Sequence, residues 1–161
     1  MQLKPGVVRA LSMRSGRSLG VVLFGSLLCL VACAPDLPDD LPSLVQLMAS
    51  NDMNVHTYAS RKVYERYGVD GLVQALQSPS PNARRQAARF IRLHPEGKGR
   101  EPIMEATKDE DASVRAWATF ALSAYPDQRT QDRLSELLKD PDPQVRNRAQ
   151  EGLEHVRSVA K

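Results

Sequence analysis

A twelve-residue pattern that returns at a fixed interval constrains the fold of this chain more than any other feature of its sequence. The pattern Asp-x-x-Val-Arg-x-x-Ala-x-x-x-Leu spans 111–122 and 142–153, and a looser copy spans 80–91. The arginines of the three copies lie at positions 84, 115 and 146, so both intervals are 31 residues. A fixed period of this length is typical of stacked helical arrays rather than of one globular core. Such arrays present a surface and seldom carry catalytic chemistry.

Apolar residues surround each arginine at two sets of positions. Positions −1, +3 and +7 hold Ala, Val, Ile or Leu, and positions −12, −9 and −8 are apolar apart from Thr107. Spacings of three and four residues place side chains on one helical face, so each copy predicts two helices with one apolar face each. The segments between them, such as 78–81 and 140–143, hold Ser, Asp and Pro, which suit the start of a second helix.

A fourth, more divergent copy precedes the others. Residues 52–63 fit the pattern with His56 in place of arginine, and the interval to the next copy is 28 residues. Divergent terminal copies are expected because an end repeat has only one neighbour. We therefore predict an all-α, right-handed α-solenoid of about four helical hairpins. The expected helices span 42–50, 54–67, 70–78, 82–94, 101–108, 112–124, 130–139 and 143–157.

The first 32 residues differ from the repeats and predict a secretory signal peptide. Four basic residues and no acidic ones occur there, and the apolar stretch from 21 to 32 is short for a membrane span. The tetrad at 30–33, Leu-Val-Ala-Cys, resembles the lipobox of bacterial lipoproteins. This resemblance implies that Cys33 is acylated, with palmitate as an expected acyl group, and that residues 1–32 are removed. The alternative is a signal anchor in which Cys33 is incidental.

The expected cleavage divides the chain into three parts and changes its charge. Residues 1–32 form the leader, 33–40 the lipidated cysteine with a short Pro/Asp linker, and 41–161 the repeat domain. Fully extended, the seven residues from 34 to 40 reach about 25 Å, so the domain is expected near the membrane surface. The whole chain carries +3, but removing four basic leader residues from 22 leaves 18 against 19 acidic ones, or −1. This balance gives no reason to expect nucleic-acid binding.

The repeated motif resembles the short HEAT repeat of phycobilin-lyase-like HEAT proteins, from about residue 41 to residue 156. Tetratricopeptide and ankyrin repeats have similar lengths, but their signature residues are absent from these copies. The resemblance implies that the motif aspartates cap the second helices and that the motif arginines bond aspartates or carbonyls of neighbouring repeats. The residues with this expected structural role are Asp52, Asp111, Asp142, Arg84, Arg115 and Arg146.

The sequence carries no motif that predicts catalysis, a metal or a cofactor. Its three histidines, His56, His94 and His155, show no zinc-ligand spacing. There is no nucleophile elbow, phosphate loop or dinucleotide fingerprint. We therefore expect a non-enzymatic protein with no catalytic residues, no metal and no cofactor.

The outward positions of the second helices form a candidate binding surface, because in HEAT arrays these helices line the concave face. Arginines at i, i+4 and i+7 of the second copy and the pair Trp117 and Phe120 of the third copy lie there. Exposed Trp, Tyr and Arg commonly anchor protein interfaces. The candidate protein-binding residues are Tyr58, Arg61, Arg85, Arg89, Arg92, Trp117 and Arg148. The alternative is a solvated charged face on which Trp117 packs against the next repeat.

Together these features favour a lipid-anchored HEAT-repeat adaptor that binds an unidentified protein in the bacterial cell envelope. Ala34 follows the cysteine where an aspartate would retain a lipoprotein in the inner membrane by enterobacteria-like sorting, so the periplasmic face of the outer membrane is favoured. The alternative is a chromophore-lyase-like enzyme or enzyme subunit of the HEAT-repeat lyase family. A membrane-surface sensor is a third hypothesis, although the acidic linker and near-neutral domain disfavour binding to anionic lipid.

Overall fold

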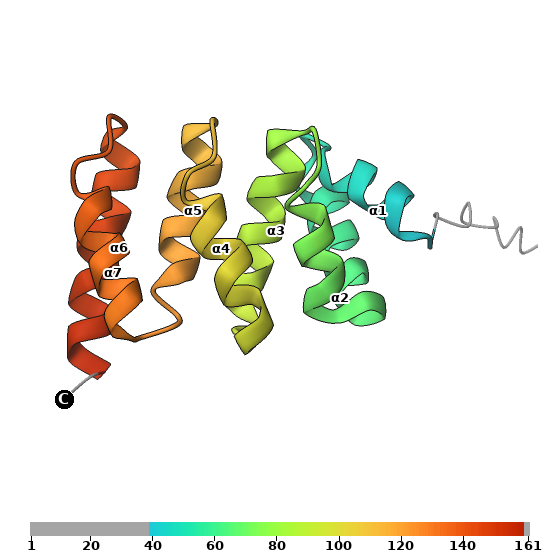
Figure 1. The fold of residues 1–161 in the computed structure, drawn as a ribbon. Helices are drawn as coiled ribbons and strands as arrows, with labels where there is room; N and C mark the ends of the chain where they lie inside the picture. Colours follow the sequence, from blue (N-terminus) through green and yellow to red (C-terminus); the bar gives the residue numbers. More distant parts are fainter. Residues whose placement is uncertain (1–38, 160–161) are drawn as a thin grey trace, which may run out of the picture. The chain divides into compact units, whose positions relative to one another are not determined.

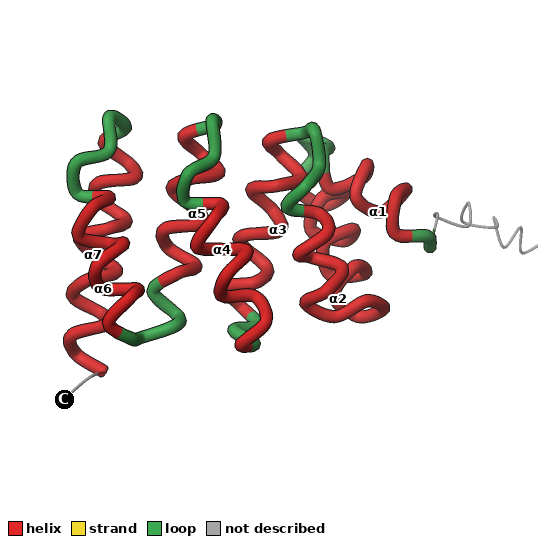
Figure 2. Tube along the Cα trace, viewed as in Figure 1, coloured by secondary structure: helices red, strands yellow, loops and turns green. Residues whose placement is uncertain are grey.

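The computed structural model describes residues 39–159, and this part of the chain consists of helices and loops without a strand (Figure 2). Its elements are α1 (Leu41–Met48), α2 (Met53–Ala75), α3 (Pro81–Leu93), the short 3-10 helix η1 (Gly97–Gly99), α4 (Arg100–Ala106), α5 (Ala112–Leu122), α6 (Gln128–Leu137) and α7 (Pro143–Val159). The predicted all-α solenoid is confirmed. Within 39–159 no helix is both long and apolar enough to cross a membrane. The expected leader, Cys33 and linker residues 34–38 lie outside the described residues.

Two of the expected helices, 54–67 and 70–78, are joined in the single helix α2. Gly68 interrupts α2 with φ 61° and ψ −155°, a backbone conformation that glycine adopts at little steric cost. The chain therefore passes from one hairpin to the next through a one-residue kink, whereas the later junctions use residues 94–99 and 123–127. For this reason the described residues form seven α-helices instead of the eight expected, and the two parts of α2 occupy the two expected positions.

Four hairpins follow one another in chain order (Figure 1). Their first helices are α1, the part of α2 after Gly68, α4 and α6, and their second helices are the part of α2 before Gly68, α3, α5 and α7. Contacts run from α2 to α3, from α3 to α5 and from α5 to α7, while α4 packs on α5 and α6 on α7. The second helices thus form one continuous layer, and their outward side chains belong to one surface.

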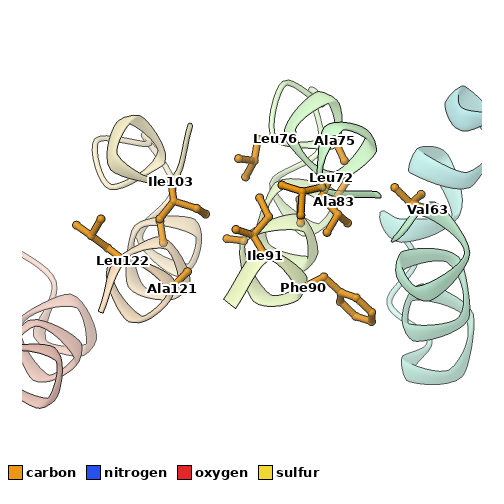
Figure 3. Packing of buried hydrophobic residues seen from close by; sticks show 14 of the residues in the cluster. Val63, Leu72, Ala75, Leu76, Ala83, Phe90, Ile91, Ile103, Ala121 and Leu122 are labelled. Atoms are coloured by element: carbon orange, nitrogen blue, oxygen red, sulfur yellow. The ribbon is translucent and has the colours of Figure 1, made fainter. Parts of the chain in front are cut away.

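The residues expected to face inward from the second helices are buried. Positions −1, +3 and +7 of the last three copies are at most 3% exposed: Ala83, Ala87, Ile91, Val114, Ala118, Leu122, Val145, Ala149 and Leu153. Figure 3 shows Ala83, Ile91 and Leu122 in the apolar interior together with Leu72 and Ile103 of the first helices. Burial of this apolar surface is the main favourable contribution to folding. It also fixes the rotation of each second helix and therefore which residues point outward.

Candidate functional site

The motif aspartates cap the second helices. One carboxylate oxygen of Asp52, Asp111 and Asp142 accepts a hydrogen bond from the backbone N–H two residues later, at 2.8, 2.9 and 2.8 Å. The same oxygens accept the N–H three residues later. Ser80 makes no such bond, and α3 begins instead with Pro81. These caps satisfy N–H groups that a helix start leaves without partners, so the aspartates act within the fold.

The motif arginines join successive hairpins through ion pairs at the turns. Arg84 forms two hydrogen bonds of 2.8 Å with Asp109, and Arg115 forms two of 3.0 Å with Asp140. All four side chains are 14% exposed or less, and we call this set the turn ladder. Each arginine also donates to two carbonyls of its own turn. Arg146 donates to carbonyls alone, those of residues 140 and 141.

The first copy is connected differently, because it lacks the arginine. His56 occupies the equivalent position and is only 7% exposed. Burial, and then the nearby charges of Arg85 and Arg89, lower the pKa of His56 below its ordinary value. Asn82 supplies the link between the first two hairpins by donating to Asn51 Oδ1 at 2.9 Å and to the carbonyl of Ala49 at 3.3 Å. A neutral amide thus replaces the ion pair of the turn ladder.

Outward side chains of three second helices meet around an aromatic pair. The rings of Trp117 and Phe120 on α5 are 6.0 Å apart in an edge-on arrangement. From α3, the guanidinium of Arg89 lies 5.9 Å from the Trp117 ring centroid, and that of Arg92 lies 4.5 Å from the Phe120 centroid. From α7, Arg148 lies 5.8 and 4.7 Å from the same two rings. Each guanidinium group is attracted electrostatically to the aromatic face beneath it, so these five residues form one unit, the arginine–aromatic ridge.

Trp117 combines the two roles that the sequence left open. It is half-buried and packs against the core cluster, while guanidinium groups from both neighbouring helices lie over its ring. The ring is therefore a support on which Arg89 and Arg148 are positioned, and its remaining surface is open to solvent. Phe120, which was absent from the candidate residues, contributes a second support. Its spacing from Trp117 was visible in the sequence, but the arginines over its ring were not.

The remaining candidates lie beside the ridge or apart from it. Arg85 is half-buried on α3, and its positive charge is one of the causes that lower the pKa of His56. Tyr58 and Arg61 belong to α2 and make local contacts there: Lys62 Nζ lies 5.9 Å from the Tyr58 ring, and Arg61 Nε lies 3.6 Å from Glu65. The structure thus brings four of the seven candidates together, namely Arg89, Arg92, Trp117 and Arg148. It places Arg85 on the same face of α3.

Histidines and surface hollows are the other features of residues 39–159 that bear on ligand binding. No group of three or more His, Cys, Asp or Glu side chains in this range is placed to hold a metal ion. His94 ends α3 and stacks on the Tyr64 ring at 3.6 Å, and His155 is exposed. A hollow of about 560 Å³ between α1, α2 and the turn before α3 is lined by apolar and neutral polar residues. A second, of about 440 Å³, borders the turn ladder at Arg84 and Asp109.

Comparisons with known proteins agree with this architecture. The family model described as HEAT repeats matches residues 69–154, which is just over half of the chain. A search of curated protein sequences finds no match. Among solved structures, the crystal structure of an engineered protein is similar, with a TM-score of 0.51 and 21% sequence identity over 73% of this chain. The alignment spans 64% of that engineered protein, and at this identity the likeness concerns the fold alone.

Proposed function

Since this chain belongs to the HEAT-repeat family, we propose that it is a non-enzymatic scaffold that binds another protein through the second-helix face of α3, α5 and α7. The arginine–aromatic ridge is the observation that carries this proposal. Arg and Trp supply much of the truncation-sensitive energy of protein interfaces when a partner desolvates them. Here they are gathered from the second helices of the last three hairpins, and packing holds them in place before any partner arrives.

Position in the cell envelope is part of the same proposal. The lipobox-like tetrad that ends at Cys33 supports a lipid anchor, and the short Pro/Asp linker supports a domain held near the membrane. Ala34 after the cysteine supports the periplasmic face of the outer membrane. An anchor of this kind raises the local concentration of the scaffold near membrane-associated partners, which strengthens modest affinities without further contacts.

The anchor is tested by replacing its cysteine. Cells that express the full chain are labelled with a fatty-acid analogue, and the purified protein is compared with its Cys33→Ser variant. We expect label on the wild type alone, together with accumulation of an uncleaved or non-lipidated form of the variant. Label retained by Cys33→Ser contradicts the assignment. Cys29→Ser is the matched control, because it lies in the expected leader and leaves the tetrad intact.

The binding face is tested by crosslinking in membranes followed by recovery of the full, anchored chain. We expect Trp117→Ala and Arg89→Ala to reduce recovery of the crosslinked partner. The matched control is Arg129→Ala on α6, whose side chain is 64% exposed and pairs with Glu101 away from the ridge. Equal recovery by all three variants overturns the proposed face and directs attention to the first-helix side or the loops.

A further inference from the structure

We propose that the segment docking on this face is an acidic helix whose carboxylates pair with Arg85, Arg89 and Arg92 of α3. The inference rests on the proposed function, because it names the chemistry of the partner at the same face. It is carried by the charges of α3 and by the way in which α5 holds two of them.

We call Arg85, Arg89 and Arg92 the arginine row. These three residues differ from most basic side chains of the domain. Within residues 39–159 none of the three forms an ion pair with a carboxylate. Elsewhere such pairs are the rule, and the longer-range ones join Arg66 to Asp39, Arg84 to Asp109, Lys98 to Asp70, Arg100 to Asp127, Arg115 to Asp140 and Arg129 to Glu101. The carboxylates on the same face lie on α7, where Glu151 pairs with Arg148, so positive charge is concentrated on α3.

This arrangement is unfavourable for the isolated domain. Like charges at i and i+4 on a helix repel one another. The three side chains are also half-buried, and Arg92 Nε is buried without a hydrogen-bond partner in the described residues. A carboxylate from a partner relieves the repulsion, because it neutralises the row and accepts hydrogen bonds from the accessible N–H groups of the guanidinium ends.

The aromatic pair prepares the row for binding. Trp117 lies under Arg89 and Phe120 lies under Arg92, so two of the three flexible side chains are already restrained. Restraint before binding reduces the side-chain entropy lost on association. The two rings are therefore positioning residues, and the arginines are the contacts.

The spacing of the row fits a helix. Seven residues along α3 span about 10 Å at a rise of 1.5 Å per residue. Glu side chains at i, i+4 and i+7 of a partner helix have the same span and face one side. An extended strand passes the same distance in about three residues, and alternate ones point away.

Charges at the other end of the face indicate a protein rather than an anionic membrane. Glu151 and Glu154 on α7 are exposed at the outward positions +5 and +8 of the fourth copy. A uniformly negative lipid surface is repelled there, whereas a helix that lies along α3 keeps its carboxylates away from these two residues. The same asymmetry places the acidic side of the partner helix over α3.

The test uses a fluorescent helical peptide with Glu at i, i+4 and i+7 and a twin with Gln at these positions, and titrates the full chain against each. We expect the Glu peptide to bind in a salt-sensitive manner and the Gln twin to bind at least about tenfold more weakly. The combined variant Arg85→Gln, Arg89→Gln and Arg92→Gln should lose the preference for Glu, while Arg129→Gln retains it. Trp117→Leu should weaken binding several-fold, and Trp117→Phe, which keeps an aromatic face, should restore it.

Several outcomes overturn the inference. These are no binding at millimolar peptide, equal affinity for both peptides, or arginine-dependent binding to phosphatidylglycerol vesicles in place of the peptide. Arginine-dependent self-association in sedimentation experiments assigns the row to a second copy instead. If crosslinking recovers a partner that Trp117→Ala removes and the triple arginine variant does not, the docking face stands and the acidic helix is refuted.

Discussion

Arg84 and Arg85 are consecutive residues of α3 in opposite situations. Arg84 is held by two hydrogen bonds to Asp109 and by two turn carbonyls, whereas Arg85 has no carboxylate partner in the described residues. Successive side chains on a helix point about 100° apart, so one faces the next turn and its neighbour faces outward. The contrast extends to most of the turn ladder and of the arginine–aromatic ridge. The ladder uses arginine to connect repeats, whereas Arg89 and Arg92 of the ridge have no carboxylate partner in the described residues, although Arg148 pairs with Glu151.

The comparison is tested most directly by replacing Arg84 and Arg85, one at a time, with alanine. Arg84→Ala leaves Asp109, whose side chain is only 12% exposed, without its ion-pair partner and removes the donor to two carbonyls, so we expect a loss of about 3 kcal/mol in the free energy of unfolding. Arg85→Ala should change it by less than about 0.5 kcal/mol, because it removes no intramolecular pair. Chemical denaturation of the two variants measures both values. Equal effects would show that the two arginines share one role.

Truncation of a core residue should give a comparable loss of stability. It tests the rotation of α5 about its axis, which decides which side chains face the core and which belong to the ridge. Leu122 is fully buried, so Leu122→Ala should cost about 2–5 kcal/mol. Leu138 is 36% exposed and serves as the control, for which a clearly smaller loss is expected. Thermal unfolding of both variants measures the difference. A Leu122→Ala protein that melts like the wild type is incompatible with the observed packing.

Trp117 belongs to both regions, and its truncation should give an intermediate result. A fully buried Trp costs about 3–5 kcal/mol on truncation, so half-buried Trp117 should cost about 1–3 kcal/mol in Trp117→Ala. The loss of the guanidinium contacts adds to this value. Calorimetry of the variant, with Arg89→Ala beside it, separates the two contributions. A loss as small as that of Arg89→Ala would remove Trp117 from the core.

Lowering the pH should reduce the stability that the turn carboxylates contribute and leave the contacts of the arginine–aromatic ridge unaffected. The bond from the Ser113 hydroxyl, followed by backbone N–H bonds, lowers the pKa of Asp111. At Asp140 burial alone would raise the pKa, but hydrogen bonds from Arg115 and the Asp142 N–H outweigh it and lower the pKa. Carboxyls with a lowered pKa stabilise the fold fully above their ordinary pKa of 3.8, and this contribution is lost as the pH falls below it.

Denaturation at a series of acidic pH values measures this dependence. The acid limb is the fall in the free energy of unfolding at low pH. Asp111→Asn should make this fall less steep, since one of the titrating groups is gone. Arg85→Ala should leave the contribution of the turn carboxyls unchanged, although it alters the titration of His56, whose pKa the charge of Arg85 lowers. An acid limb that keeps its slope in Asp111→Asn would exclude this carboxyl as a source of the effect.

Much of the fold was predictable because each copy of the repeat predicts the same pair of helices. The apolar positions recur in all four copies, the 31-residue interval relates the last three, and a capping aspartate occurs in three of the four. The merging of two helices in α2 was not predictable in the same way. It depends on Gly68 adopting φ 61° where the sequence suggested an ordinary short loop.

At the candidate site, the sequence predicts the direction of the side chains, and the tertiary structure shows which of them are in contact. The sequence alone determined which residues of α3, α5 and α7 point outward, since helical periodicity and burial of the apolar stripe leave no other rotation. Only the tertiary structure decided that Arg84 pairs with Asp109, that Arg89 and Arg92 lie over Trp117 and Phe120, and that Tyr58 stays apart. These contacts join residues about 25 to 30 positions apart, and their distances depend on how closely the small alanines let neighbouring helices approach.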